Sequence, residues 1–183
     1  MALCIPTLPT PNTCPDACSP TVEFARIDSI RFRLGDAPFA DFGDNAEWAA
    51  RLSDSAPDTA TEKYIRTIYG IGDYPESSTD KIEFSLDRVL YSEKQHTINF
   101  EIDNICQAHL DLLRFTEEHP SFQYRVWFTG AKSVHGGNEG VLASFVMKKV
   151  ISANRKELVK IKMEISFKGL TPLTKPLPEI LKV

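Results

Sequence analysis

The segment from Glu157 to Gly169 places the strongest constraint on the fold of this chain. Apolar and polar residues alternate along it without interruption. The apolar set is Val159, Ile161, Met163, Ile165 and Phe167, and the polar set is Lys160, Lys162, Glu164, Ser166 and Lys168. A period of two residues puts successive side chains on opposite faces of a strand. The pattern therefore predicts a long antiparallel strand with one buried face and one face in water.

Other segments carry similar strand signals. Val141–Ser152 precedes the alternating segment and predicts a hairpin with it, through a turn at Ala153–Arg155. Further strands are predicted at Val22–Leu34, Tyr64–Ile71, Lys81–Tyr91, His96–Asp103 and Phe122–Gly130. Only the four residues Ser-Glu-Lys-Gln separate Lys81–Tyr91 from His96–Asp103, which favours a second hairpin there.

Two helices are predicted between these strands. Asp44 is a good N-cap for a short helix over Asn45–Leu52, with Glu47 in the capping-box position and Trp48 on its buried side. Asn104 precedes a longer helical pattern over Ile105–His119, which Pro120 ends. The glycine-rich stretch 133–140 leads into a strand and not a helix, so it predicts a turn between strands and not a phosphate cradle.

This order of elements predicts a mainly β fold, an antiparallel β-sandwich or partial barrel with one flanking α-helix. The predicted single domain spans residues 22–169. Residues 1–21 are rich in proline and predict an extended N-terminal arm, and residues 170–183 predict an extended C-terminal tail. Residues 53–61 are small and polar and predict a flexible loop.

Composition excludes several classes of protein. The 183 residues are 42% hydrophobic, too many for a disordered chain, and no window is apolar enough for a membrane span. The first residues lack a basic segment and a long apolar segment, so no secretory signal is expected. Residues 1–139 carry 12 Lys/Arg against 22 Asp/Glu, whereas residues 140–183 carry 9 against 3. This split favours either self-association between unlike surfaces or an ordinary distribution of solvated charges.

No catalytic or metal-binding constellation stands out in the sequence. The four histidines, His96, His109, His119 and His135, are scattered over different elements, and none has a second ligand at helical spacing. Cys4, Cys14 and Cys18 do not match a zinc pattern. Reduced thiols are expected, with a Cys14–Cys18 disulfide or a three-cysteine metal site between subunits as alternatives. We expect no cofactor, no metal and no enzymatic activity.

Two other patterns bear on binding. Glu83 and Asp87, and Glu101 and Asp103, are carboxylate pairs on strands predicted to be neighbours, which indicates a solvated acidic sheet face more than a glycosidase site. Trp127 falls on the polar side of its strand beside Gln123 and Arg125. With Tyr124, it leaves a carbohydrate-binding β-sandwich module open as an alternative function.

The order of elements over residues 62–170 resembles the tail tube proteins of long-tailed bacteriophages, whose fold is shared with the tube subunits of contractile injection systems. The resemblance rests on the paired strands 81–103, the helix 104–119, the strand 122–130, the Gly-Asn-Glu-Gly loop and the hairpin 141–169. The segment GVLASFVMKKVISANRKELVKIKMEISFKG is especially similar to the closing hairpin of such subunits.

This resemblance implies a structural virion protein of the phage tail, assembled in the host cytoplasm without a membrane. It implies homohexameric rings stacked into a tube for DNA ejection, with four strands per subunit lining the lumen and the helix outside. The partners would be other copies, the tail terminator, the tape measure and the hub, with DNA passing transiently. The arm 1–20, the loop 53–63 and the tail 170–183 would contact other subunits. A terminator, head–tail connector or baseplate hub is the alternative within this class.

A channel that conducts DNA should repel phosphate. Glu83, Asp87, Glu101 and Asp103 are therefore the predicted lumen-facing residues. The basic hairpin with Lys160, Lys162 and Lys168 would then face an acidic neighbouring subunit, or the lumen would be of mixed charge.

Overall fold

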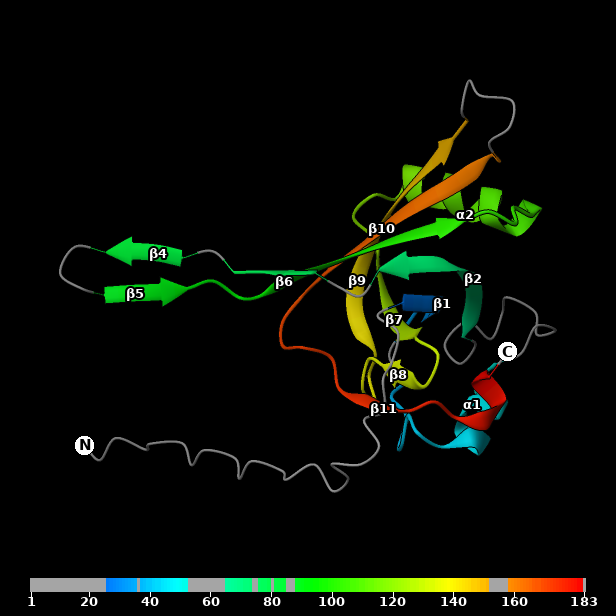
Figure 1. Cartoon of the computed structure of the whole chain (residues 1–183), viewed down its shortest axis with the longest axis horizontal. Helices are drawn as coiled ribbons and strands as arrows, with labels where there is room; N and C mark the ends of the chain where they lie inside the picture. The colour runs from blue at the N-terminus through cyan, green and yellow to red at the C-terminus, as the bar shows by residue number, and fades with distance from the viewer. Residues whose placement is uncertain are drawn as a thin grey trace, which may run out of the picture.

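The computed structural model confirms a mainly β fold. It describes residues 26–35, 37–52, 65–73, 76–79, 81–84, 88–151 and 158–182. The predicted arm 1–21 and the loop 53–61 lie outside the described residues. Most of the described strands belong to one sheet, which closes on itself (Figure 1).

Closure depends on β1 (Arg26–Arg33), which pairs with a strand on each side. Six antiparallel strands follow one another around the ring and return to β1. Their order after β1 is β2 (Arg66–Asp73), β6 (Gln95–Ile102), β10 (Lys160–Lys168), β9 (Val141–Val150) and β7 (Gln123–Thr129). The barrel thus has no unpaired edge strand in its wall.

The interior of the barrel is filled by the residues that the two-residue period predicts. On β10, Ile161, Met163, Ile165 and Phe167 are buried, whereas Val159 precedes the strand and is exposed. The other interior side chains come from all the remaining barrel strands and include Ile30, Phe32, Ile68, Ile98, Phe100, Ile102, Tyr124, Val126, Phe128, Ala143, Phe145 and Met147. The predicted half-buried strand is confirmed.

Helix α2 (Gln107–Glu118) covers one end of the barrel. It connects β6 to β7, and these strands are three positions apart in the ring of six, so the connection must cross the barrel mouth. Leu110, Leu112, Leu113 and Phe115 pack against the barrel core from this position. The helix begins after Cys106, two residues later than the Asn104 cap predicts.

A second apolar cluster lies outside the barrel wall, over β1 and β7. Helix α1 (Asn45–Arg51) confirms the predicted helix: the Asp44 side chain accepts from the Ala46 N–H, and Trp48 is buried. Glu47 instead accepts from the Ala40 N–H at 3.0 Å, so the predicted capping box does not form. The cluster contains Phe39, Phe42, Trp48, Ile65, Trp127, Val134 and Leu181.

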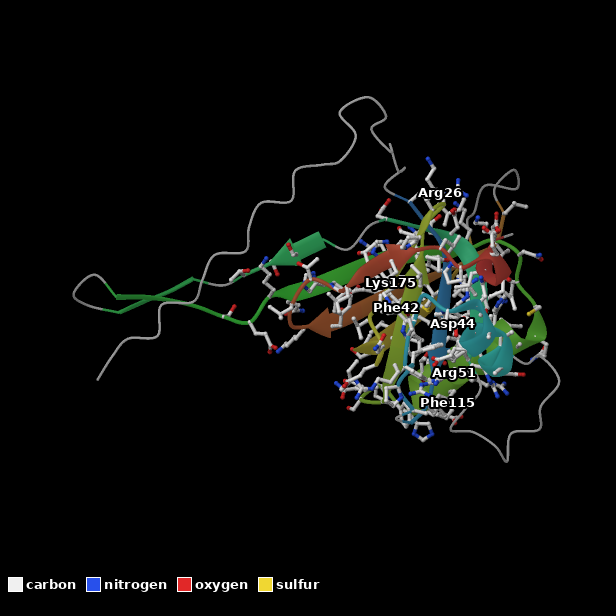
Figure 2. All side chains as sticks on the ribbon, turned by 90° about the horizontal axis from the view of Figure 1, so that it is seen from below. Arg26, Phe42, Asp44, Arg51, Phe115 and Lys175 are labelled. Carbon is white, nitrogen blue, oxygen red and sulfur yellow. The ribbon has the colours of Figure 1, made fainter. Side chains whose placement is uncertain are left out.

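The C-terminal segment packs against its own chain, which differs from the predicted extended tail between subunits. Strand β11 (Thr174–Pro176) pairs with β8 (Ser133–His135), and the 3-10 helix η2 (Glu179–Leu181) buries Leu181 in the second cluster. Lys175 is ion-paired with Asp41 and lies 5.1 Å from the centre of the Phe42 ring (Figure 2).

Residues 81–91 form two strands and not the single strand that the sequence predicts. Strands β4 (Lys81–Phe84) and β5 (Arg88–Tyr91) pair only with each other, and this small sheet extends away from the barrel (Figure 1). The predicted hairpin with His96–Asp103 is also wrong. Strand β6 pairs instead with β2, β10 and the short β3 (Glu76–Ser78).

The glycine-rich loop is a turn between strands, as predicted, and it encloses Trp127. The indole Nε1–H donates to the carbonyl of Gly137 at 2.7 Å. Gly136 and Gly140 have positive φ, and a Cβ atom would lie 2.6 and 2.8 Å, respectively, from atoms of the Trp127 ring. Glycine is needed at both positions because the backbone conformation and the adjacent indole exclude a side chain.

Gly140→Ala should therefore destabilise the protein by about 2 kcal/mol or more, because it adds left-handed strain and an overlap with Trp127. Urea unfolding followed by tryptophan fluorescence would measure this loss. Gly43→Ala is the matched control, since its nearest obstacle is the flexible Lys175 side chain. Equal unfolding midpoints for the two variants would contradict this account of the loop.

Candidate interaction surface

The outer wall of the barrel has one covered half and one open half. Over β1 and β7, the outward residues Arg31, Arg33 and Trp127 are buried beneath other segments of the chain. Over the four adjacent strands β2, β6, β10 and β9, outward residues remain in solvent. Tyr69 is 55% exposed, Ile71 52% and Val146 49%. We call this half the open sheet face, comprising Tyr69, Ile71, Asn99, Glu101, Leu142, Val146, Lys148, Lys160, Lys162 and Glu164.

The register places a charged row across the open sheet face. Glu101 of β6 lies opposite Ile71 of β2 on one side and Lys162 of β10 on the other, and Lys162 lies opposite Lys148 of β9. The Glu101 carboxylate accepts from Lys160 Nζ at 3.0 Å and lies 3.2 Å from Lys162 Nζ. One carboxylate thus joins two ammonium groups on a single strand.

These contacts hold the pKa of Glu101 below its usual range. The hydrogen bond from Lys160 is the largest cause, followed by that from Lys162, and partial burial opposes them. The carboxylate is 39% exposed, so water screens the ion pairs and limits their stabilisation to less than about 1 kcal/mol. We call Glu101, Lys160 and Lys162 the Glu101 triad. These ion pairs fix the positions of the charges on the open sheet face and contribute little to the stability of the fold.

The structure brings only part of the predicted acidic set together. Glu101 lies on the open sheet face, and Asp103 is exposed directly after β6. Glu83 belongs to β4, in the separate two-stranded sheet, so its strand is not a neighbour of β6 as predicted. Asp87 lies outside the described residues. The sequence places the two pairs on adjacent strands because the short spacer before His96 resembles a hairpin turn.

The predicted separation of acidic strands from a basic hairpin is wrong. Strands β6 and β10 are direct neighbours, and Glu101 pairs with two of the hairpin lysines within one chain. The alternative of a mixed-charge face matches the described residues. Sequence charge counts could not reveal this arrangement, because they do not report which strands pair.

Between the barrel wall and the second apolar cluster lies a buried polar layer that the sequence does not predict. Arg31 is 2% exposed, and its Nη1 donates to Ser29 Oγ at 2.7 Å and to Thr129 Oγ1 at 2.9 Å. Burial lowers the pKa of Arg31 to about 10, and the nearby Tyr69 opposes this shift, so the guanidinium is charged at neutral pH. Its Cζ lies 5.9 Å from the centre of the Trp48 ring. In the sequence, the polar residues that alternate along β1 are typical of a solvent-exposed strand face, so their burial is not predicted.

The aromatic residues proposed for carbohydrate binding are not available on the surface. Trp127 is 0% exposed and packs against Phe39 and Trp48. Tyr124 points into the barrel, stacks on Phe145, and burial raises the pKa of its hydroxyl to about 12. The prediction that these rings present a sugar-binding surface is therefore wrong.

The described histidines, cysteines and carboxylates do not form a reactive site. Within the described ranges, no three His, Cys, Asp or Glu residues gather as a metal site. His135 bridges Ser133 and Thr174, at 2.8 Å to each hydroxyl. Cys106 is free and exposed, whereas Cys4, Cys14 and Cys18 lie outside the described residues. No helix in the described part of the chain is long and apolar enough to cross a membrane.

No protein-family model, curated protein or solved structure matches this chain.

The depressed pKa of Glu101 gives a prediction with a definite sign. Since the folded-state value is lowered, the ion pairs stabilise the protein above the ordinary carboxyl pKa and lose this effect as pH falls through the lowered value. Glu101→Gln should cost less than about 1 kcal/mol at neutral pH, and nothing in strong acid. Chemical denaturation at several pH values would measure this.

Glu164→Gln is the control, because Glu164 lies on the same face and is not part of the triad. Replacing Lys160 and Lys162 by methionine should bring the NMR titration midpoint of Glu101 back to the ordinary range. An unchanged midpoint would show that the two lysines are not the cause.

Proposed function

We propose that this protein is a structural subunit of a phage tail tube, without enzymatic activity. The open sheet face supports this proposal, because four adjacent strands of one chain present an exposed surface of charged, polar and apolar side chains there. Tail tube subunits line their lumen with four strands each, and the sequence resembles that family in its order of elements. The exposed strands β2, β6, β10 and β9 are the candidates for the lumen lining.

The chemistry of the open sheet face is suited to a polymer that must slide. Its charges are partly neutralised within the Glu101 triad, and Asn99 and Glu164 lie opposite each other next to the triad. Such a face offers phosphate fewer unpaired cations than the lysine count implies. DNA binding without sequence preference depends on released counterions, so pairing the lysines weakens it.

The proposed role requires self-association. The closed barrel wall has no free strand edge with which a second copy could pair. The wall is closed, so additional copies must join through side-chain contacts, through the projecting β4–β5 sheet or through the terminal segments. The homohexameric ring and its partners, the tail terminator, the tape measure and the hub, are part of this proposal, as is a location in the virion.

Electron microscopy of the purified protein in negative stain tests the proposal directly. Rings or tubes with an axial channel are expected, because one repeated contact closes into a ring or extends as a filament. A monodisperse monomer at high concentration, confirmed by sedimentation velocity, would contradict a tube. A terminator or connector role would give single rings that never stack.

Charge reversal on the open sheet face should separate channel lining from subunit contact. Glu101→Lys with Glu164→Lys adds four units of positive charge to each subunit, so tubes should still form but should retain DNA more strongly at low salt. Co-sedimentation of tubes with double-stranded DNA over a salt series would measure this. The conservative pair Glu101→Gln with Glu164→Gln should have a smaller effect. Loss of tube formation in both variants would place this face in a subunit contact.

A further inference from the structure

Three lysines gather on the open sheet face. Lys160 and Lys162 alternate along β10, and Lys148 of β9 lies opposite Lys162. Alternate residues of a strand are about 6.7 Å apart and neighbouring strands about 4.8 Å apart, so the three side chains can reach neighbouring phosphates of one DNA duplex. The side chains of Lys160 and Lys162 are 43% and 59% exposed, and Lys148 is exposed as well. Lysines are common contacts to a nucleic-acid backbone.

Glu101 occupies two of these three cations. Its carboxylate accepts from Lys160 Nζ at 3.0 Å and lies 3.2 Å from Lys162 Nζ. The strand register fixes this arrangement, because Glu101 lies directly opposite Lys162. A carboxylate in this position competes with phosphate for the lysine N–H donors and also repels phosphate. Lys148 has no such carboxylate partner within the described part of the chain.

The neighbouring carboxylates do not share this role. Glu164 lies opposite Asn99 on one side and Val146 on the other, and Asp103 directly follows β6. Within the described ranges, neither carboxylate takes part in an ion pair. Glu101 therefore differs from the other acidic residues of this face in its contacts and not in its charge.

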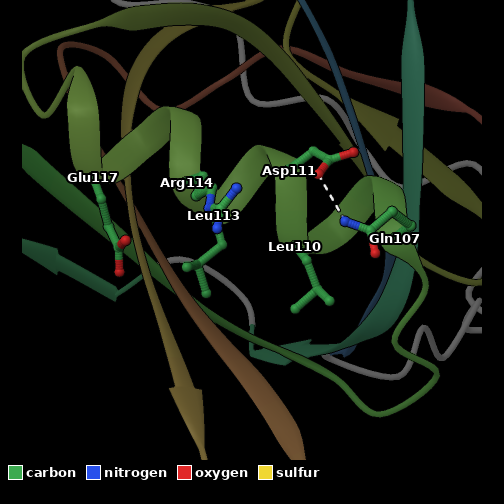
Figure 3. Close-up of a pocket in the computed structure, with 6 residues that line it drawn as sticks. All are labelled: Gln107, Leu110, Asp111, Leu113, Arg114 and Glu117. Carbon is green, nitrogen blue, oxygen red and sulfur yellow. Dashed lines mark hydrogen bonds between the residues drawn. The ribbon is translucent and has the colours of Figure 1, made fainter.

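The hollow along α2 is a poorer candidate for a phosphate site. It measures about 300 Å³ and is lined by Gln107, Leu110, Asp111, Leu113, Arg114 and Glu117 (Figure 3). The exposed carboxylates of Asp111 and Glu117 oppose the single lining cation, Arg114, and this balance repels phosphate. The lysine group on the open sheet face has the more favourable charge for a polyanion.

We propose that the open sheet face is a masked binding site for the phosphate backbone of double-stranded DNA, and that Glu101 masks it by holding Lys160 and Lys162. Each lysine that contacts phosphate releases counterions and adds affinity, so masking two of them keeps DNA bound weakly. A surface that DNA must pass needs such weak binding. The choice of DNA as the ligand rests on the proposed function, whereas the masking rests on the contacts of Glu101.

DNA binding by the full chain, at concentrations below those at which it associates, tests the masking. Glu101→Gln should raise the association constant for a short duplex by up to about fivefold, which is the effect expected when exposed ion pairs are removed. A plot of log association constant against log salt concentration should become steeper by about 0.9 for each released lysine, and thus by about 0.9 to 1.8. Fluorescence anisotropy over a salt series would measure both quantities.

Glu164→Gln is the matched control, because it removes the same charge from the same face and releases no lysine of the Glu101 triad. Its salt slope should stay at the value of the original protein. Replacing Lys160 and Lys162 by methionine in the Glu101→Gln chain should remove the gain in both affinity and slope. Equal slopes for the two glutamine variants, or a gain that survives the methionine replacements, would overturn the masking.

The result of this assay does not depend on assembly, so it can be separated from the test of the tube. Rings or tubes in the electron microscope, together with equal slopes for Glu101→Gln and Glu164→Gln, would refute the masking and leave the proposed tube standing. A steeper slope confined to Glu101→Gln, in a chain that never assembles, would support the masked site and contradict the tube.

Discussion

The pairing of β1 with both β2 and β7 is the interaction on which the rest of the structure depends. It closes the barrel, directs Ile30 and Phe32 into the core, and turns Arg31 and Arg33 outward. Those arginines lie in a wall that the second cluster covers, and the opposite wall is left open. Closure also removes free strand edges from the wall. Among the described residues, the open sheet face, the C-terminal segment and the β4–β5 sheet remain on the outside of the barrel.

The local features of this fold could be predicted from the sequence. A two-residue period decides which side of β10 is buried, whatever the neighbouring strands are. The structure confirms Ile161, Met163, Ile165 and Phe167 as interior residues. The Asp44 cap and the buried Trp48 are likewise short-range features, because a helix end must satisfy its own N–H groups. The glycine-rich turn is a short-range feature too, because its glycines allow the backbone conformations that a tight turn needs.

Features that depend on a covering layer could not be predicted in this way. Period alone cannot distinguish an outward residue in water from one beneath another segment. The sequence therefore predicts Trp127 on a polar face although it is buried, and it gives no sign that Arg31 is buried as well. The sequence pattern also does not predict which strands pair. Glu101 has Lys162 opposite it across 61 positions of sequence, and the apparent hairpin before His96 concealed this neighbour. The sequence therefore predicts only part of the candidate surface.

We propose that the open sheet face lines an axial channel. A direct test labels a single cysteine at Asn99, in a chain whose native cysteines are serine, with a gold cluster and images the assembled particles. We expect density on the axis of the ring or tube, and density at the outer rim when the only cysteine is Cys106. Peripheral density from the Asn99 position, or particles without an axial channel, would contradict it.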